Sequence, residues 1–289
     1  MSLKPSEVQP PPELEPGHAV ATVSRRTGVS QHRPTSAEQR TARIMGAWFL
    51  GTFIFSIPAF WFYDPLLNHA NYVVGGGQDT RVAVGALLEI CLAVTGIATA
   101  VVIFPIVKRV NESVALGYIA SRTVESIIIL VGVMSLMSVV ALRQGIASRT
   151  PHGPLVDVAR GLLAVHDQTA MLGPQFCAGL GNGILLGYLM WRSRLLPRPM
   201  VMLGLIGGPL ALVAGAGVLL RLWSSHAGLP VAMTAPEAIW EFSLSVWLLV
   251  RGFRPSPILT GPSFRNAPAI RTVAEAQNTA TAGTHRKGF

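Results

Sequence analysis

The chain has 289 residues, of which 50% are hydrophobic and only 13% are charged. A soluble domain of this size carries about twice that charged fraction, so the composition excludes an ordinary soluble globule and a wholly disordered chain. The formal net charge is +9, but the basic residues lie in the tails and short loops. Because they form no basic amphipathic stripe, we expect no nucleic-acid partner.

The two ends of the chain differ from its centre. Residues 1–40 are polar and contain several prolines, and residues 253–289 carry four prolines before an Ala/Thr-rich stretch. Both are predicted to be disordered cytoplasmic tails. Residues 41–252 form the predicted membrane domain. No cleavable signal is expected, because no small-x-small cleavage site follows the first apolar run.

The membrane domain contains six apolar segments, and a bilayer-spanning helix needs about 20 apolar residues. The segments cover residues 44–62, 82–107, 114–142, 170–191, 200–220 and 234–250. Their apolar runs are continuous rather than alternating, so no strand is expected. The sequence therefore predicts an all-α fold, a bundle of six transmembrane helices.

The distribution of Lys and Arg predicts how the bundle is oriented. With the N-terminus in the cytoplasm, seventeen of these residues fall on the cytoplasmic side and five on the opposite side, while Arg122 lies within a span. Cytoplasmic loops of membrane proteins carry such an excess. We therefore expect both termini to be cytoplasmic and the chain to be a multi-pass protein of a bacterial plasma membrane.

Four ionisable residues lie inside the predicted spans, where such residues are costly and usually functional. Glu89 belongs to the second span, Arg122 and Glu125 to the third, and Glu241 to the sixth. Helical spacing puts Tyr118 on the same face as Arg122 and Glu125. We expect a polar cluster in which Arg122 meets Glu241, Glu125 or both, with Glu89 nearer the external side.

The charge balance of this cluster suggests a function. Three carboxylates against one guanidinium leave two surplus negative charges, which bound protons would reduce. Such a cluster suits a proton relay, or the binding or translocation of a small solute. The alternative is an ion pair that only fixes the register of the helices.

The fourth segment adds polar and small residues. Gln175 and Asn182 lie seven residues apart on one helical edge, which either lines a small cavity or hydrogen-bonds a neighbouring helix. Gly179, Gly183 and Gly187 form a close-packing face, and the fifth segment carries a similar one. These faces leave open a membrane-protein partner or a homo-oligomer.

His166 and Asp167 precede the fourth segment on the predicted external side. They are the candidates for a second class of function, a membrane-embedded enzyme that acts on a lipid or quinone near that face. Imidazoles can converge on a metal or haem, but no two histidines lie one helical turn apart, and Cys91 and Cys177 lie in apolar runs. We therefore expect no metal and no cofactor, and we favour a non-enzymatic protein.

Several short motifs occur in a characteristic order along the chain. They are Ser56-Ile-Pro-Ala-Phe, Tyr63-Asp-Pro-Leu-Leu-Asn68, Asp79 to Glu89, Asn111 to Tyr118 followed by Arg122 and Glu125, His166-Asp167, Leu172-Gly-Pro174, Ser193 to Arg198, Gly204 to Pro209, and Trp240-Glu241. Together they resemble the prokaryotic membrane family described as domain of unknown function 4386, over roughly residues 40 to 253. The resemblance implies an integral membrane location and no assigned activity, and it supplies no functional residues.

Overall fold

The computed structural model describes residues 31–68, 72–75, 77–146, 152–224 and 227–259. Helices account for nearly all of them, and the described part contains a single isolated β-bridge, between His32 and Ser256. The helices are α1 (Ser36–Leu67), α2 (Asp79–Val107), α3 (Glu112–Ile146), α4 (His152–Ala170), η1 (Met171–Cys177), η2 (Gly179–Leu186), α5 (Gly187–Ser193), α6 (Arg198–Leu219) and α7 (Gly228–Val250). The predicted all-α fold is confirmed.

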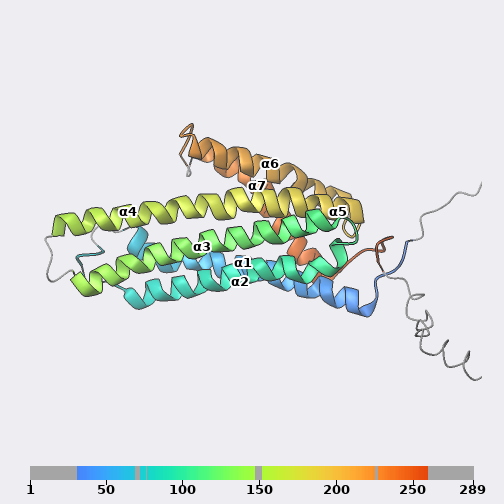
Figure 1. Cartoon of the computed structure of the whole chain (residues 1–289), viewed down its shortest axis with the longest axis horizontal. Helices are drawn as coiled ribbons and strands as arrows, with labels where there is room; N and C mark the ends of the chain where they lie inside the picture. Colours follow the sequence, from blue (N-terminus) through green and yellow to red (C-terminus); the bar gives the residue numbers. More distant parts are fainter. Residues whose placement is uncertain (1–30, 69–71, 76, 147–151, 225–226, 260–289) are drawn as a thin grey trace, which may run out of the picture. The chain divides into compact units, whose positions relative to one another are not determined.

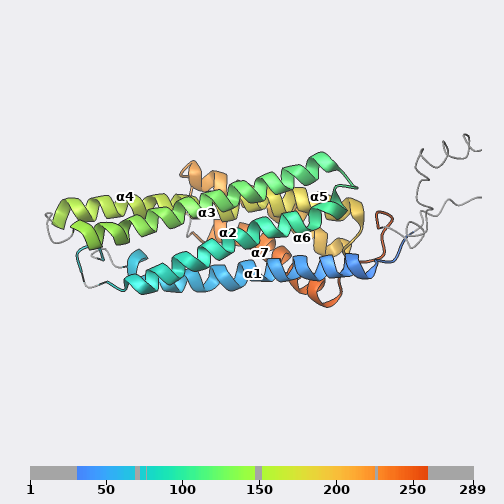
Figure 2. The ribbon, with the colours of Figure 1, turned by 60° about the horizontal axis from the view of Figure 1, so that its bottom comes forward.

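The described helices form six rods, because α4, η1, η2 and α5 follow one another without a break. Consecutive rods pack against each other, α1 on α2, α2 on α3, α3 on α4 and α6 on α7, and α7 closes back onto α1. Figures 1 and 2 show the rods running back and forth along the length of the bundle. The six-helix bundle predicted from the apolar segments is therefore present.

Several helices start earlier than their apolar segments predict. Thr35 and Glu38 form a capping box that starts α1 at Ser36, so residues 36–40 are helical although the tail was predicted to reach residue 40. The fourth rod starts at His152 rather than at residue 170. Its first part, α4, is amphipathic: Leu155 is buried while the side chain of Asp157 is exposed. A search for continuous apolar runs misses such a helix.

The middle of the fourth rod is π-helical through both η1 and η2. π-Helical turns are rare and frequently mark functional sites. Pro174 lies within η1, where it has no backbone N–H to donate to the preceding turn. The rod is thereby wound differently from an α-helix where it passes the centre of the bundle.

The surface of the bundle is apolar and its centre contains charged residues. In the part of the chain that the structure describes, four helices, α1, α2, α3 and α6, are long and apolar enough to cross a membrane. Large apolar side chains such as Ile54, Leu87 and Met134 point outward with more than half of their surface exposed, whereas Arg122 and Glu125 are buried. This inverts the pattern of a soluble protein and is that of an integral membrane protein.

Two apolar cores lie at different levels of the bundle. One includes Phe49, Trp240 and Leu248, and the other includes Tyr63 and Leu136. Along α3, Tyr118 belongs to the first core and Val133 to the second, so Arg122 and Glu125 fall between them. The tertiary structure thus places a polar layer between two apolar ones.

The loops between α2 and α3 and between α5 and α6 lie at the end of the bundle where α1 begins and α7 ends (Figure 1). Arg109 after α2 pairs with Glu38 at 3.6 Å, and the backbone N–H of Arg254 donates to the carbonyl of Leu195. Phe253 and Leu259 are buried there, so residues 253–259 pack on the bundle. The predicted disorder of residues 1–30 and 260–289 falls outside the described residues.

Candidate functional site

An ion pair between neighbouring turns of α3 forms the centre of the site. Arg122 Nη1 donates to Glu125 Oε2 at 2.6 Å, and the two side chains are only 4% and 8% exposed. Arg122 Nε also donates to the carbonyl of Gly96 on α2 at 3.2 Å. A Cβ atom at position 96 would lie 3.0 Å from the guanidinium. The glycine on α2 therefore leaves the space that the arginine occupies.

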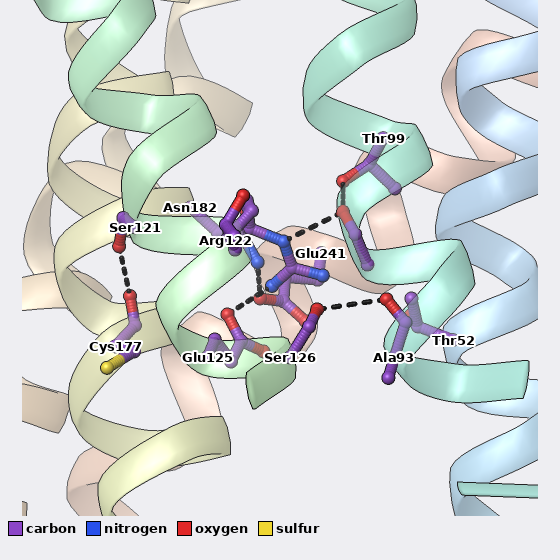
Figure 3. Close-up of polar contacts among 12 residues, drawn as sticks. Thr52, Ala93, Thr99, Ser121, Arg122, Glu125, Ser126, Cys177, Asn182 and Glu241 are labelled. Carbon is purple, nitrogen blue, oxygen red and sulfur yellow. Dashed lines mark hydrogen bonds and ion pairs between the residues drawn. The ribbon is translucent and has the colours of Figure 1, made fainter. Parts of the chain in front are cut away.

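Glu241 on α7 lies beside this pair (Figure 3). Its Oε1 accepts a short hydrogen bond from Asn182 Nδ2 on η2, and the indole of Trp240 donates to the backbone carbonyl of Asn182 at 3.1 Å. Asn182 therefore hydrogen-bonds a neighbouring helix, which is one of the two roles that the sequence predicts for it. The described residues contain an ion pair of Arg122 with Glu125 and none with Glu241.

Hydroxyl groups fasten α3 to its neighbours around the ion pair. Ser126 donates to the carbonyl of Ala93 on α2 at 2.9 Å, and Ser121 donates to that of Cys177 on η1 at 3.0 Å. Tyr118 is fully buried and its hydroxyl lies 3.4 Å from that of Thr99. These contacts hold the arginine and its carboxylate in one position, as preorganised sites require.

A cavity of about 1020 Å³ reaches the ion pair. Its inner end is lined by Arg122, Glu125, Glu241 and Gln175. Its walls come from α1, α2, α3, α4, η1 and α7. At the other end the lining includes Trp61 and Asp167, whose side chains are largely exposed. The cavity thus connects the buried charges with the surface. Tyr118 does not line it.

Glu89 and His166 lie along this cavity. Tyr63 donates to Glu89 Oε2 at 3.0 Å, and Glu89 Oε1 lies 3.9 Å from His166 Nε2. The rings of Tyr63 and His166 meet edge to face with centroids 5.8 Å apart. His166 Nδ1 lies 3.9 Å from the exposed carboxylate of Asp167 and has no hydrogen-bond partner within the described residues.

The position of His166 and Asp167 differs from the one expected. The sequence predicts that they open the fourth helix on the external side, whereas they lie in the last turns of α4, and His166 is only 4% exposed. They line the same cavity as Arg122 and Glu241. The two groups of candidate residues, which the sequence suggests for different functions, therefore belong to one site.

Sequence reasoning missed several residues of the site. Tyr63, Asp64, Arg81 and Thr52 lie on α1 and α2, and their place becomes apparent only when these helices pack. Glu237 is not one of these, because helical spacing alone predicts it on the same stripe as Glu241, one turn earlier. It is 3% exposed, and neither carboxylate oxygen has a hydrogen-bond partner within the described residues.

The glycine faces pack inside the chain. A Cβ atom on Gly183 would lie 2.3 Å from the Cα of Gly208, and one on Gly204 would lie 2.7 Å from the indole of Trp240. These faces join η2, α6 and α7 to one another. Among the described residues, no three His, Cys, Asp or Glu side chains are placed to hold a metal ion; His69 and His226 lie outside them.

Comparison with known proteins assigns a family to most of the chain. The family model described as a domain of unknown function (DUF4386) matches residues 44–252. These residues include every residue of the cavity and all six rods except the first turns of α1. No curated protein and no solved structure matches the chain.

Proposed function

We propose that this chain, which belongs to the DUF4386 family, binds a small solute or protons and moves them across the membrane. The description of the family names no activity. The proposed site is the cavity that ends at Arg122, Glu125 and Glu241. From the distribution of basic residues we further propose that the protein lies in a bacterial plasma membrane with both termini in the cytoplasm. The cavity then opens toward the external side.

One observation carries this proposal. A single cavity of about 1020 Å³ extends from exposed residues such as Asp167 to an ion pair buried between two apolar cores. Ionisable residues at such depth mark substrate and ion pathways and proton relays in membrane proteins. An ion pair that served only to fix helix register would not need an open path to it.

The charge balance favours protons as part of what moves. The inner end of the cavity holds two carboxylates, of Glu125 and Glu241, against the one guanidinium of Arg122, and Glu237 lies one turn from Glu241. Glu89 and His166 lie between this end and the surface, and their facing atoms are 3.9 Å apart. A proton that enters the cavity therefore meets both carboxylates and an imidazole on its way inward.

The other two classes of function are less well supported. An enzyme built on His166 and Asp167 would need its own site, and these residues share the cavity with the Arg122 cluster. A structural partner would dock on free glycine faces, and Gly183, Gly204 and Gly208 are covered within the chain. Transport therefore accounts for more of the structure.

Proton flux in proteoliposomes tests the proposal. The full chain is reconstituted with a pH-sensitive dye trapped inside, and a pH gradient is applied. We expect Glu125→Gln to reduce the flux by about tenfold or more, because it removes the carboxylate at the end of the path. Glu112→Gln is the matched control: the same substitution, in the first turn of α3, at an exposed position outside the cavity.

The outcomes separate a functional defect from a folding defect. Each variant is first checked for a monodisperse elution profile and the thermal midpoint of the wild type. Should Glu125→Gln misfold because Arg122 loses its partner, Glu241→Gln replaces it. The proposal would be contradicted if the flux of whichever variant folds, Glu125→Gln or Glu241→Gln, equalled that of the wild type.

A further inference from the structure

The residues that line the cavity carry an excess of negative charge. Five carboxylates face it, against two guanidiniums and one imidazole. They belong to Asp64, Glu89, Glu125, Asp167 and Glu241 on one side and to Arg81, Arg122 and His166 on the other. Even with His166 protonated, two negative charges remain in excess. A cavity with low-dielectric walls concentrates ions of the opposite sign, so this one attracts cations.

The outer guanidinium forms no ion pair with these carboxylates among the described residues. Arg81 donates to the backbone carbonyl of Trp61 at 2.6 Å and to Gln78 Oε1 at 3.2 Å. Glu89 accepts a hydrogen bond from the hydroxyl of Tyr63 and lies 3.9 Å from His166. Within the described residues no guanidinium pairs with it.

The cavity also presents a buried acceptor that lacks a donor. Gln175 Oε1 has no hydrogen-bond partner within the described residues. Buried polar atoms are nearly always paired in native proteins. His166 turns Nε2 toward Glu89 and Nδ1 toward Asp167, so both ring nitrogens face carboxylates. The complement that the amide oxygen of Gln175 needs is a ligand with N–H donors.

Apolar and aromatic side chains form the rest of the wall. Phe53 and Phe60 on α1, Leu92 on α2 and Ile129 on α3 line the cavity between its charged positions. Aromatic faces attract organic cations, and mostly apolar cavities of up to about 1000 Å³ are typical of small-molecule sites. A bare proton or metal ion needs no wall of this kind.

We infer that the cavity binds a protonated organic amine, with its ammonium group near Glu89 and the amide oxygen of Gln175 and its apolar part against the aromatic residues of α1. The inference rests on the proposed function and names the class of solute. An anion would be repelled by the excess carboxylates, and a neutral molecule would leave their negative charge unbalanced.

Three probes of nearly the same shape and different charge test this. They are 2-phenylethylammonium, the neutral 2-phenylethanol and the anionic 3-phenylpropanoate. Their binding to the purified full chain in detergent is measured by isothermal titration calorimetry at neutral pH, with protein-free micelles as the blank. We expect the ammonium to bind at least about tenfold more tightly than either isostere. Equal affinities, or a preference for the anion, would overturn the inference.

Two variants locate the ammonium. Glu89→Gln is expected to weaken its binding by about tenfold or more, as when one member of a buried charge pair is removed. Glu112→Gln, on the exposed first turn of α3, leaves the affinity unchanged. If Glu89→Gln does not fold, Asp64→Asn at the outer end of the cavity takes its place. An affinity that neither cavity variant alters contradicts the assigned position.

The flux assay distinguishes this inference from the proposed function. Proton flux that depends on Glu125, without a preference for the ammonium probe, overturns the solute class alone. Ammonium binding that depends on Glu89, without proton flux either with or without the probe present, supports the solute class and overturns proton translocation.

Discussion

Arg122 and Glu125 form a buried ion pair on adjacent turns of α3, with 2.6 Å between Nη1 and Oε2. Both charges lie in the interior of a membrane protein, where an isolated charge is expensive. Their mutual contact and the carbonyl of Gly96 are what make the arginine tolerable at this depth. The pair therefore makes a sharper test of stability than any surface ion pair of the chain.

Removing one member of this pair should cost more than removing both. Arg122→Gln leaves Glu125 buried without its guanidinium, and we expect a loss of about 3–5 kcal/mol. The double variant Arg122→Gln/Glu125→Gln restores neutrality and should unfold at a higher temperature than the single variant. Thermal midpoints of the detergent-solubilised proteins, followed by tryptophan fluorescence, give the comparison. A double variant less stable than the single one would contradict this account.

The crossing of η2 and α6 depends on glycine. Gly183→Ala would place a Cβ atom 2.3 Å from the Cα of Gly208, so we expect the rods to be pushed apart and the thermal midpoint to fall clearly. Gly117→Ala on α3 is the control, because its Cβ atom would meet nothing closer than Leu185 at 3.7 Å. There alanine should be neutral or stabilise by about 0.5–1 kcal/mol. Similar midpoints for the two variants would show that the rods do not pack as described.

Gln39 joins the start of α1 to the chain after α7. Its amide donates to the carbonyl of Phe253 at 3.0 Å and accepts from the same residue's N–H at 3.1 Å. Gln39→Ala removes both bonds, and we expect a loss of about 1–3 kcal/mol. Arg40→Ala, one residue along and exposed, should leave the midpoint within experimental scatter. Limited proteolysis should cleave near Phe253 faster in the Gln39 variant alone.

A tyrosine between α1 and α2 predicts the response to alkaline pH. Burial, together with the hydrogen bond to Asp79 at 2.6 Å, raises the pKa of Tyr72 above its usual range. The folded state keeps this phenol protonated, so its contribution to stability is complete below the unfolded pKa of about 10 and is lost as the pH rises above it.

Tyr72→Phe tests this response. The variant should be less stable than the wild type by about 1 kcal/mol at neutral pH, and the difference should shrink above about pH 10 because phenylalanine does not ionise. Thermal midpoints across this range measure the change. Tyr188→Phe, at an exposed position, is the control. A difference that stays constant into the alkaline range would refute the assignment.

Cysteine labelling tests the cavity and the orientation together. In a background with Cys91 and Cys177 replaced by alanine, Gln175→Cys places a thiol in the cavity wall. A positively charged, membrane-impermeant thiol reagent added to intact cells should modify it. Leu180→Cys projects from the outer surface of the rod among apolar side chains, where a thiol stays protonated and reacts slowly. Labelling of position 175 only in inside-out vesicles would reverse the proposed orientation.

Much of the architecture follows from the sequence. The number and order of the rods could be predicted because each span must satisfy its own backbone hydrogen bonds in hydrocarbon and therefore stands out as an apolar run. Glu89, Arg122, Glu125 and Glu241 could be identified for the same reason, since each charge is conspicuous in such a run. The likeness to the DUF4386 family is confirmed by the match over residues 44–252.

Only the tertiary structure decided which of these charges meet. Arg122 pairs with Glu125, Glu241 turns to Asn182, and His166 lies inside α4 against Glu89. The last two contacts join helices far apart in the sequence, and they depend on how the rods rotate and cross. The amphipathic α4 also carries no continuous apolar run, and the apolar run that follows it does not show that its turns are π-helical rather than α-helical.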